Sequence, residues 1–334
     1  MQVRQLGRSG PQVAQIGLGL MGMSDLYGPA ERGESIATIH AALEAGVTLL
    51  DTGDFYGMGH NELLLREALA GGRRDNAVIS VKFGALRDPD GGWSGSDCRP
   101  AAVKNFAAYS LRRLDVERID IYRPARLDPA VPIEDTVGAI AELIKAGHVG
   151  HIGLSEVSAA TLRRAHAVHP ISDLQIEYSL ISRGIEDEIL PVARELGIGI
   201  TAYGVLSRGL ISGHWSARRE GEQDFRGQFS PRFQGANLAS NLALVEELRA
   251  IADELGVTVA QLAIAWVAAQ GADIVPLVGA RRRDRLREAL GAVSLRLSAA
   301  DLARLERVIP AGAAAGGRYH AHLARDLDSE RAAS

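Results

Sequence analysis

The sequence predicts an α/β fold, a single (β/α)8 barrel that carries an N-terminal hairpin and two extra helices. Eight short apolar runs recur along the 334 residues, and a helical pattern follows each run. Runs of this length with few polar residues are typical of strands that are buried on both faces. Strands that alternate with helices are joined by right-handed crossovers, and eight such units favour a closed parallel barrel.

The eight predicted strands are spread over most of the chain. They comprise residues 15–19, 47–51, 77–82, 119–122, 148–154, 174–178, 198–203 and 274–278. An open doubly wound sheet is the alternative, because residues 17–22 match the Gly-x-Gly-x-x-Gly pattern of a dinucleotide-binding turn. No helix opens at Gly22, since Tyr27-Gly28-Pro29 follows, so the match lacks its strand–turn–helix context.

Caps and stop signals mark the helices between these strands. Ser158 is a favourable N-cap for a helix over residues 159–168. Thr258 and Gln261 fit a capping box before the apolar stripe that follows them. Glycine stops end the helices that are predicted at 35–45 and 134–146.

Other segments complete the predicted organisation. Residues 3–13 predict a small hairpin before the barrel. Residues 207–238 lack periodicity and follow a strand end, where barrel active sites lie, so we expect a functional lid or a disordered segment there. The two extra helices are predicted at 242–255 and 301–308. We expect one domain over residues 1–320 and a flexible polar tail over 321–334.

The amino-acid composition and net charge exclude several classes of function. Hydrophobic residues make up 46% of the chain and charged residues 23%, which is typical of a globular protein. The net charge of −4 gives no overall basic field for nucleic acid or an anionic membrane. A single cysteine, Cys98, excludes an intramolecular disulfide and a cysteine-based metal site. The N-terminus is too polar for a signal peptide core, and no run suits a membrane span, so we expect a cytoplasmic protein.

Three titratable side chains follow the ends of neighbouring predicted strands. Asp51 closes the second strand, Tyr56 lies in the loop after it, and Lys82 closes the third. Strand ends on one face of a barrel converge, so these groups are expected to meet. An ammonium group makes a neighbouring phenol more acidic, and a carboxylate holds that ammonium in place. A buried Asp–Lys pair beside a surface tyrosine is the alternative.

Several motifs resemble the aldo-keto reductase superfamily, and they occur in the superfamily's order from about residue 3 to residue 308. They are Asp51-Thr52-Gly53-Asp54-Phe55-Tyr56-Gly57, Asn61-Glu62, Val81-Lys82-Phe83-Gly84, Ile152-Gly153-Leu154-Ser155-Glu156 and Leu174-Gln175-Ile176-Glu177-Tyr178-Ser179. Met21-Gly22-Met23-Ser24 resembles its bacterial and plant branch. The resemblance implies a barrel that binds NADPH across its C-terminal face and transfers hydride to a carbonyl. It implies that Tyr56 is the general acid, Lys82 the acidifying lysine and Asp51 the partner of Lys82.

The resemblance also implies a cofactor site and no metal. Ser155 and Gln175 match positions that bind the nicotinamide carboxamide, and Tyr203 matches the residue that stacks on its ring. Arginines after the eighth strand match the segment that binds the 2′-phosphate, which favours NADPH over NADH; a solvated basic helix face is the alternative. The predicted cofactor-binding residues are Gly19, Leu20, Met21, Ser155, Gln175, Tyr203, Gly204, Leu206, Ser207, Gly209, Leu210, Gly279, Arg281, Arg282, Arg285 and Glu288.

One departure from the superfamily pattern affects the predicted chemistry. Aligning Asp128-Pro129 with the superfamily's own Asp-Pro puts Ala125 where a histidine usually donates to the substrate carbonyl. Alternation along the strand puts Arg123 on the same side as Ala125. Arg123 either fills the vacated space or forms a structural ion pair with Asp51 or Glu177, and we favour the structural pair.

The predicted function is NADPH-dependent reduction of an aldehyde or ketone, with a small-molecule carbonyl substrate and neither nucleic acid nor membrane as partner. An NADPH-binding sensor or partner subunit with little turnover is the alternative, because Ala125 cannot donate. A third possibility is another kind of barrel enzyme that binds a phosphate group, but such an enzyme would have no use for Tyr56. The sequence identifies neither the natural carbonyl substrate nor the oligomeric state. The predicted substrate-binding residues are Met23, Tyr27, Phe55, Trp93, Arg123 and Arg126.

Overall fold

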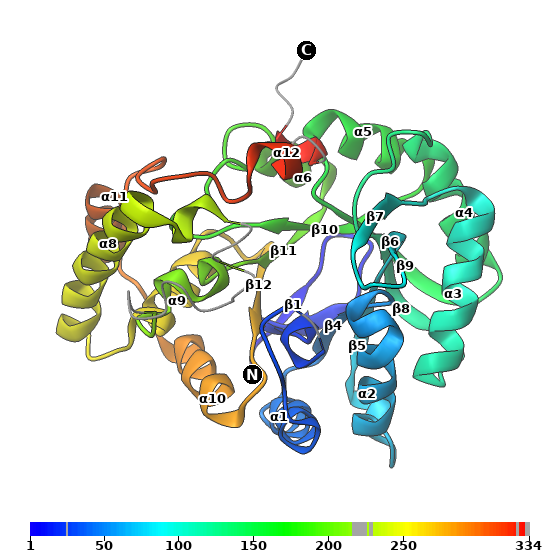
Figure 1. Cartoon of the computed structure of the whole chain (residues 1–334), viewed down its shortest axis with the longest axis horizontal. Helices are drawn as coiled ribbons and strands as arrows, with labels where there is room; N and C mark the ends of the chain where they lie inside the picture. The colour runs from blue at the N-terminus through cyan, green and yellow to red at the C-terminus, as the bar shows by residue number, and fades with distance from the viewer. Residues whose placement is uncertain (25, 216–225, 227–229, 325–326, 331–334) are drawn as a thin grey trace.

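Eight parallel strands form a closed barrel, and helices lie around its outside (Figure 1). The computed structural model describes residues 1–24, 26–215, 226, 230–324 and 327–330. The predicted (β/α)8 fold and all eight predicted strands are confirmed. In barrel order the strands are β3 (Gly17–Gly19), β4 (Leu49–Gly53), β5 (Val78–Phe83), β8 (Ile119–Pro124), β9 (Val149–Ser155), β10 (Ile171–Glu177), β11 (Gly199–Tyr203) and β12 (Ile274–Gly279), which pairs with β3.

The helices follow the predicted alternation with the strands. Those of the barrel are α1 (Arg32–Glu44), α2 (His60–Ala68), α3 (Pro100–Leu114), α4 (Ile133–Lys145), α5 (Ala159–Val168), α6 (Ile189–Leu196), α9 (Val259–Ala269) and α10 (Arg283–Gly291). The two extra helices are confirmed as α8 (Gly235–Glu254) and α11 (Ala299–Val308), which pack together. Short helices are η1 (Met21–Met23), η2 (Tyr56–Gly59), η3 (Arg73–Asn76), η4 (Ser207–Ser212), η6 (Pro231–Phe233), η7 (Ala292–Ser294), α12 (Ala321–Ala324) and η8 (Asp328–Glu330).

Helix α8 begins earlier than the sequence predicts. Its buried stripe includes Leu238, Asn241 and Val245, so a polar residue interrupts the apolar pattern in its first half. Asn241 is buried because its side-chain amide donates to two carbonyl oxygens, those of Arg232 at 3.1 Å and Ala315 at 2.9 Å. Of the predicted loop over 207–238, residues 216–225 and 227–229 lie outside the described residues.

Two hairpins are added to the barrel. The predicted N-terminal one is confirmed as β1 (Val3–Gln5) and β2 (Gln12–Ala14), and Leu6 and Val13 pack against Ile121 in an apolar cluster at the barrel's amino end. The second hairpin follows β5 and was not predicted, because glycines and polar residues obscure its alternation. It consists of β6 (Ala85–Arg87) and β7 (Trp93–Ser96).

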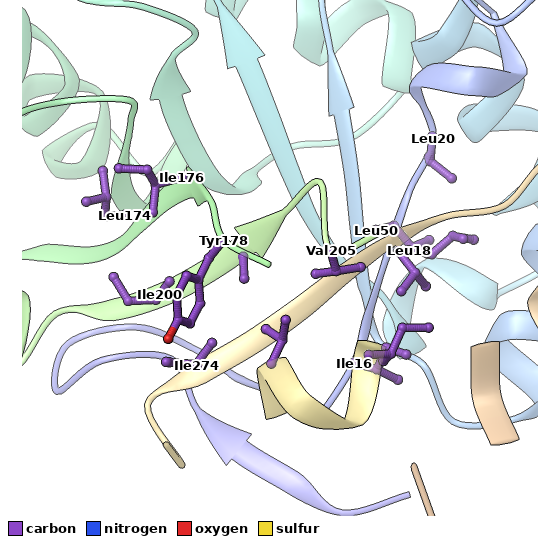
Figure 2. Packing of buried hydrophobic residues seen from close by; sticks show 14 of the residues in the cluster. Ile16, Leu18, Leu20, Leu50, Leu174, Ile176, Tyr178, Ile200, Val205 and Ile274 are labelled. Carbon is purple, nitrogen blue, oxygen red and sulfur yellow. The ribbon is translucent and has the colours of Figure 1, made fainter. Parts of the chain in front are cut away.

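The main core lies between the outer face of the barrel and its helices. Register partners on neighbouring strands contribute side chains to it, such as Leu18 beside Leu50 and Ile200 beside Ile274 (Figure 2). These four side chains are fully buried. Burial of such aliphatic groups stabilises a fold by about 1.5–3 kcal/mol each, so this layer holds the strand ends in place.

The inside of the barrel is polar and hydrogen-bonded. Arg123 on β8 forms a fully buried ion pair with Asp173 on β10, with an Nη1–Oδ2 distance of 2.8 Å. Its Nη2 donates to Ser80 at 3.0 Å, and Thr201 donates to Asp173 at 2.6 Å. A Cβ atom at Gly153 would lie 2.9 Å from both the Arg123 guanidinium carbon and an Asp173 oxygen, so this glycine makes room for the pair.

The ion pair of Arg123 is therefore structural, as expected, but its predicted partners are wrong. Asp51 is occupied by Lys82, and Glu177 lies at the barrel mouth with Arg208. Asp173 was overlooked because the strand was predicted to begin at residue 174, whereas β10 begins at Ile171 and points Asp173 into the barrel.

The chain after α11 returns to the barrel beside β10 and β11 (Figure 1). Within the predicted tail, Leu327 and Asp328 are buried, and the Ser158 amide donates to Asp328 at 2.8 Å. Residues 325–326 and 331–334 lie outside the described residues. The described part of the tail thus packs on the domain.

Within the described ranges, no single helix has both the length and the apolarity of a membrane span. Helices α8 and α9 meet that test only as a pair, which is bent by 87°, and only by length and composition.

Replacing Arg123 by Leu should lower the free energy of unfolding by about 3–5 kcal/mol, because it leaves the Asp173 carboxylate buried without its partner. The double variant Arg123→Leu/Asp173→Leu should recover much of this loss. Urea denaturation followed by circular dichroism measures both. Arg163→Leu, which breaks an exposed pair with Glu195, is the control and should change little. Equal effects of the buried and exposed substitutions would contradict the structural role of Arg123.

Candidate active site

Asp51 lies at the centre of a hydrogen-bonded group at the C-terminal end of the barrel. Its Oδ1 accepts a hydrogen bond from the Lys82 ammonium, and its Oδ2 accepts from Ser80 at 2.9 Å and from Gln175 at 2.8 Å. All four side chains are buried. Burial lowers the pKa of Lys82, and the Asp51 carboxylate opposes that shift. The carboxylate therefore fixes the position of the ammonium group, as predicted.

Tyr56 lies against this group at the start of η2. The Lys82 Nζ is 5.2 Å from the centre of the Tyr56 ring, and Phe55 packs on that ring edge-on at 4.8 Å. Among the described residues, the Tyr56 hydroxyl has no hydrogen-bond partner. Burial, and then the charge of Asp51, raise the pKa of Tyr56 well above 10, while Arg126 lowers it. The phenol is therefore protonated at neutral pH and able to donate to a ligand.

Ala125 shares an apolar cluster with Phe55 and Tyr56 at the barrel mouth. It directly follows β8, is 3% exposed, and its amide donates to the Phe83 carbonyl at 2.8 Å. Its methyl group offers no hydrogen bond to a ligand that contacts Tyr56.

Two predicted cofactor-binding side chains converge on the same mouth as Tyr56. Ser155 ends β9, and within the described residues its hydroxyl has no hydrogen-bond partner. Tyr203 ends β11, and its hydroxyl donates to Glu156 at 2.7 Å. Gln175, by contrast, already donates to Asp51, which leaves its amide oxygen and a second N–H for a ligand.

A second charged layer, which the sequence did not predict, surrounds this mouth. Arg318 from the C-terminal segment forms a bidentate pair with Glu156, at 2.9 and 2.6 Å, and its Nη1 also donates to Glu177 at 3.4 Å. Burial raises the pKa of Glu156, but Arg318 outweighs it and lowers that pKa to about 2. Tyr319 follows, with the Arg208 guanidinium 4.4 Å from its ring. No periodic pattern or motif marks residues 311–320, so the sequence held no signal for this contact.

The loop after β11 has an unusual backbone. Ser207, Arg208 and Gly209 are all left-handed, with φ of 45°, 57° and 95°. Non-glycine residues seldom adopt this conformation, and such strain is concentrated at functional sites. The amide of Ser207 donates to the Gly204 carbonyl at 2.6 Å, and that of Gly209 donates to the Leu206 carbonyl at 2.8 Å, so these two hydrogen bonds hold the loop in its turn.

The arginines after β12 line a cleft of about 690 Å³ together with residues 29–31 and Glu34. Carboxylates already pair with two of the four arginines that line it: Arg282 with Asp284 at 2.7 Å, and Arg283 with Glu34 at 2.9 Å. Arg285 pairs with Glu288 at 3.1 Å and is not among the residues that line the cleft. Arg287, which was not predicted, lines the cleft and has no paired carboxylate among the described residues.

The other predicted site residues occupy different depths. Leu20 and Met23 are buried in the main core, and the Leu20 amide donates to the Asp51 carbonyl at 2.9 Å. Arg123 is closed inside the barrel, whereas Arg126 is half-buried at the mouth. Trp93 is 49% exposed and contacts Phe55 edge-on at 5.6 Å. Five more predicted residues are partly exposed near the mouth or in the loops beyond it, namely Gly19, Met21, Tyr27, Gly204 and Leu206. Leu210 is buried, and Gly279 is exposed.

No cluster of three metal-ligating side chains occurs in the part of the chain that the structure describes. Asp54, two residues before Tyr56, is instead an unusual carboxyl group. It is 8% exposed, and its Oδ2 has no hydrogen-bond partner within the described residues. Burial, reinforced by the nearby Glu62, raises the pKa of Asp54 to about 8.

Asp54 should make the protein less stable as pH rises. Its native pKa of about 8 exceeds the usual unfolded value of about 3.9, so the native state binds more protons between these values and its stability falls with pH across that window. Asp54→Asn should remove this slope, as measured by urea denaturation from pH 5 to pH 8.5. Asp253→Asn, at an exposed site, is the control. If Asp54→Asn retains the wild-type slope, the carboxyl group does not titrate as described.

Comparisons with known proteins agree with this geometry. The profile of the Aldo/keto reductase family matches residues 15–310. A probable aldo-keto reductase 1 from Glycine max is 42% identical over 323 residues, which cover 96% of this chain and 92% of that protein. The glycerol dehydrogenase AKR11B4 from Gluconobacter oxydans is 26% identical, with a TM-score of 0.82 over 98% of this chain and 96% of its own. The holo form of the aldo-keto reductase AKR11C1 from Bacillus halodurans is also 26% identical, with a TM-score of 0.77 over 96% and 99%. The chain therefore belongs to the aldo-keto reductase family, whose members reduce small carbonyl compounds with nicotinamide cofactors.

Proposed function

We propose that this protein reduces an aldehyde or ketone with NADPH, and that Tyr56 is the general acid. One observation carries the proposal: a protonated tyrosine faces the barrel mouth directly beside the buried Lys82–Asp51 pair. A small-molecule carbonyl substrate that enters this mouth meets the Tyr56 hydroxyl as its hydrogen-bond donor. A cytoplasmic location belongs to the same proposal and is tested by cell fractionation.

In the proposed reaction the chain's own residues hold and move one proton. The Tyr56 hydroxyl hydrogen-bonds the carbonyl oxygen and transfers its proton as negative charge develops there. Lys82, fixed by Asp51, stabilises the resulting phenolate through its positive charge. Phe55 and Ala125 exclude water from one side of the oxygen. Bound NADPH would supply the hydride.

The residues present fit such a cofactor in two places. At the barrel mouth, the unpartnered Ser155 hydroxyl and the remaining groups of Gln175 suit a carboxamide, which needs a donor and an acceptor. Tyr203 would stack on the ring. The loop at 207–209 follows β11 at the mouth and is proposed to hold the pyrophosphate, and the arginine-lined cleft suits the 2′-phosphate. The proposed set also keeps the predicted Gly19, Leu20, Met21, Gly204, Leu206, Leu210, Gly279 and Glu288.

NADPH rather than NADH is proposed because of the charge of this cleft. Four arginines line it, and three acids, Glu31, Glu34 and Asp284, offset part of their charge. A phosphate dianion would draw Arg282 and Arg287 toward it, since guanidinium groups bind phosphate through two N–H bonds.

An NADPH-binding sensor or partner subunit with little turnover is the second candidate. Ala125 favours it, because in place of the usual histidine its methyl group leaves the carbonyl with one fewer donor. Removing one such donor typically costs about 3–4 kcal/mol in the transition state. Tight NADPH binding without oxidation across a panel of aldehydes would favour this candidate over a reductase.

Tyr56→Phe should reduce kcat for aldehyde reduction by at least about a thousandfold, because the proton donor is lost. The ring and its contacts with Phe55 remain, so NADPH affinity should stay within about twofold. Stopped-flow oxidation of NADPH and fluorescence titration measure the two quantities. Tyr109→Phe, which changes an exposed tyrosine on α3, is the matched control. A Tyr56→Phe enzyme with near-normal kcat would rule out Tyr56 as the acid.

NADPH should bind at least about tenfold more tightly than NADH, and Arg282→Ala should remove most of that difference. Arg285→Ala should have the smaller effect, because Arg285 pairs with Glu288 and His214 away from the cleft lining. Quenching of tryptophan fluorescence gives the dissociation constants, and Arg307→Ala on α11 is the control. Equal wild-type constants for the two cofactors would refute the NADPH proposal, whatever the variants show.

A further inference from the structure

Arg126 is a cation at the barrel mouth that the proposed chemistry leaves unused. It is the second residue after β8, directly beyond Ala125, and it is half-buried. Its Nη1 donates to the Ala125 carbonyl at 2.6 Å. This is the side chain's single hydrogen bond to the described residues, and none of their carboxylates lies within 4.0 Å of it. Its Nε and Nη2 donors are thus available to a ligand.

The other cations around the mouth are paired. Lys82 binds Asp51 and Arg318 binds Glu156, and both acids are fully enclosed. Arg208 lies 3.4 Å from Glu177. Glu156 supports the positive charge of Arg126 from a distance, but none of the described carboxylates pairs with the guanidinium directly, so its remaining donors lack an anionic partner. Such a group has the strongest electrostatic reason to bind an anion that enters from solvent.

Arg126 also lies within electrostatic reach of the reacting group. The pKa of Tyr56 is raised first by burial and then by Asp51, and Arg126 is the cation that opposes them most. The same guanidinium lowers the pKa of Tyr319 and opposes the rise in that of Tyr203. A ligand that hydrogen-bonds Tyr56 and extends toward Tyr203 or Tyr319 therefore comes within the field of Arg126.

The small residue between Tyr56 and Arg126 leaves space for such a ligand. Ala125 belongs to the same apolar cluster as Tyr56, and it contributes only a methyl group next to Arg126 in the chain. A substrate that placed its carbonyl on Tyr56 would carry any nearby substituent toward Arg126.

We propose that Arg126 binds a carboxylate of the substrate, so that the carbonyl compounds reduced here are keto acids or aldehyde acids. This inference rests on the proposed carbonyl reductase function. A planar guanidinium matches a carboxylate through two parallel N–H bonds. A single unpaired cation balances one negative charge. A phosphate monoester would bring a second charge close to Glu156 and Glu177, so a carboxylate fits better.

The first test compares matched acids and esters with the wild-type enzyme. Glyoxylate, 4-oxobutanoate and 5-oxopentanoate, each beside its methyl ester, vary the spacing between carbonyl and carboxylate. At least one acid should exceed its ester by about thirtyfold in kcat/KM, mainly through a lower KM. Glyceraldehyde 3-phosphate tests a phosphate group in place of the carboxylate. If its kcat/KM exceeds that of every acid, the proposal that Arg126 binds a carboxylate is overturned.

Arg126→Leu supplies the decisive comparison. It should lower kcat/KM for the preferred acid by about a hundredfold and change that of its ester by less than about threefold. Arg126→Lys should restore part of the lost kcat/KM, because an ammonium group keeps the positive charge but lacks the two parallel N–H donors of a guanidinium. Arg112→Leu, at an exposed arginine on α3 with no described partner, is the control. Equal losses for acid and ester would overturn the proposal and make Arg126 a general donor or a structural group.

A binding measurement keeps this inference separate from the proposed function. Calorimetric titration of the NADP-loaded protein with 4-hydroxybutanoate and 5-hydroxypentanoate should give binding that Arg126→Leu weakens by at least about tenfold. Loss of this binding in Arg126→Leu, with an unchanged dissociation constant for NADPH, supports the inference even in a protein that turns over no aldehyde. No binding by the wild type, or a weaker NADPH complex of Arg126→Leu, would overturn it.

Discussion

The active site depends on a chain of polar contacts that crosses the inside of the barrel. Ser80 joins its two halves, because its hydroxyl donates to Asp51 and accepts from Arg123. One half fixes the Lys82 ammonium, and the other contains the fully buried pair of Arg123 and Asp173. In a low-dielectric interior these contacts are costly to break, so the network holds the strands in one register, although the Nε of Arg123 has no hydrogen-bond partner among the described residues. The position of Tyr56 depends on that register.

Charge at the mouth is arranged in two layers with different consequences. The inner layer, Lys82 with Asp51, is closed and sets the environment of the phenol. The outer layer joins β9 and β10 to the C-terminal segment through Arg318 and its two acids, Glu156 and Glu177. The segment after α11 therefore belongs to the site, although it is far from the catalytic residues in sequence. Its acids also limit how much negative charge a ligand can bring.

The arginine-lined cleft, which is proposed above to bind the 2′-phosphate, also contains ion pairs. Arg282 is paired there with Asp284, and Arg283 with Glu34, so a phosphate that bound as proposed would compete with carboxylates that are already in place. Exposed pairs of this kind are weak and easily exchanged, whereas the buried pairs inside the barrel are not. In the proposed site, the phosphate end would therefore rearrange on binding while the Lys82–Asp51 end kept its geometry.

The sequence by itself determined the barrel, its eight strands and the grouping of Asp51, Tyr56 and Lys82, because short apolar runs, period-3.6 helical patterns and strand-end positions are local properties. Local patterns do not say which inward side chain meets which across the barrel, so Asp173 was missed as the partner of Arg123. The contact of Arg318 with Glu156 spans 162 positions and leaves no periodic trace. Only the tertiary structure decided these pairings, because the partners of buried charges are set by the closure and stagger of the barrel and by the path of the returning chain.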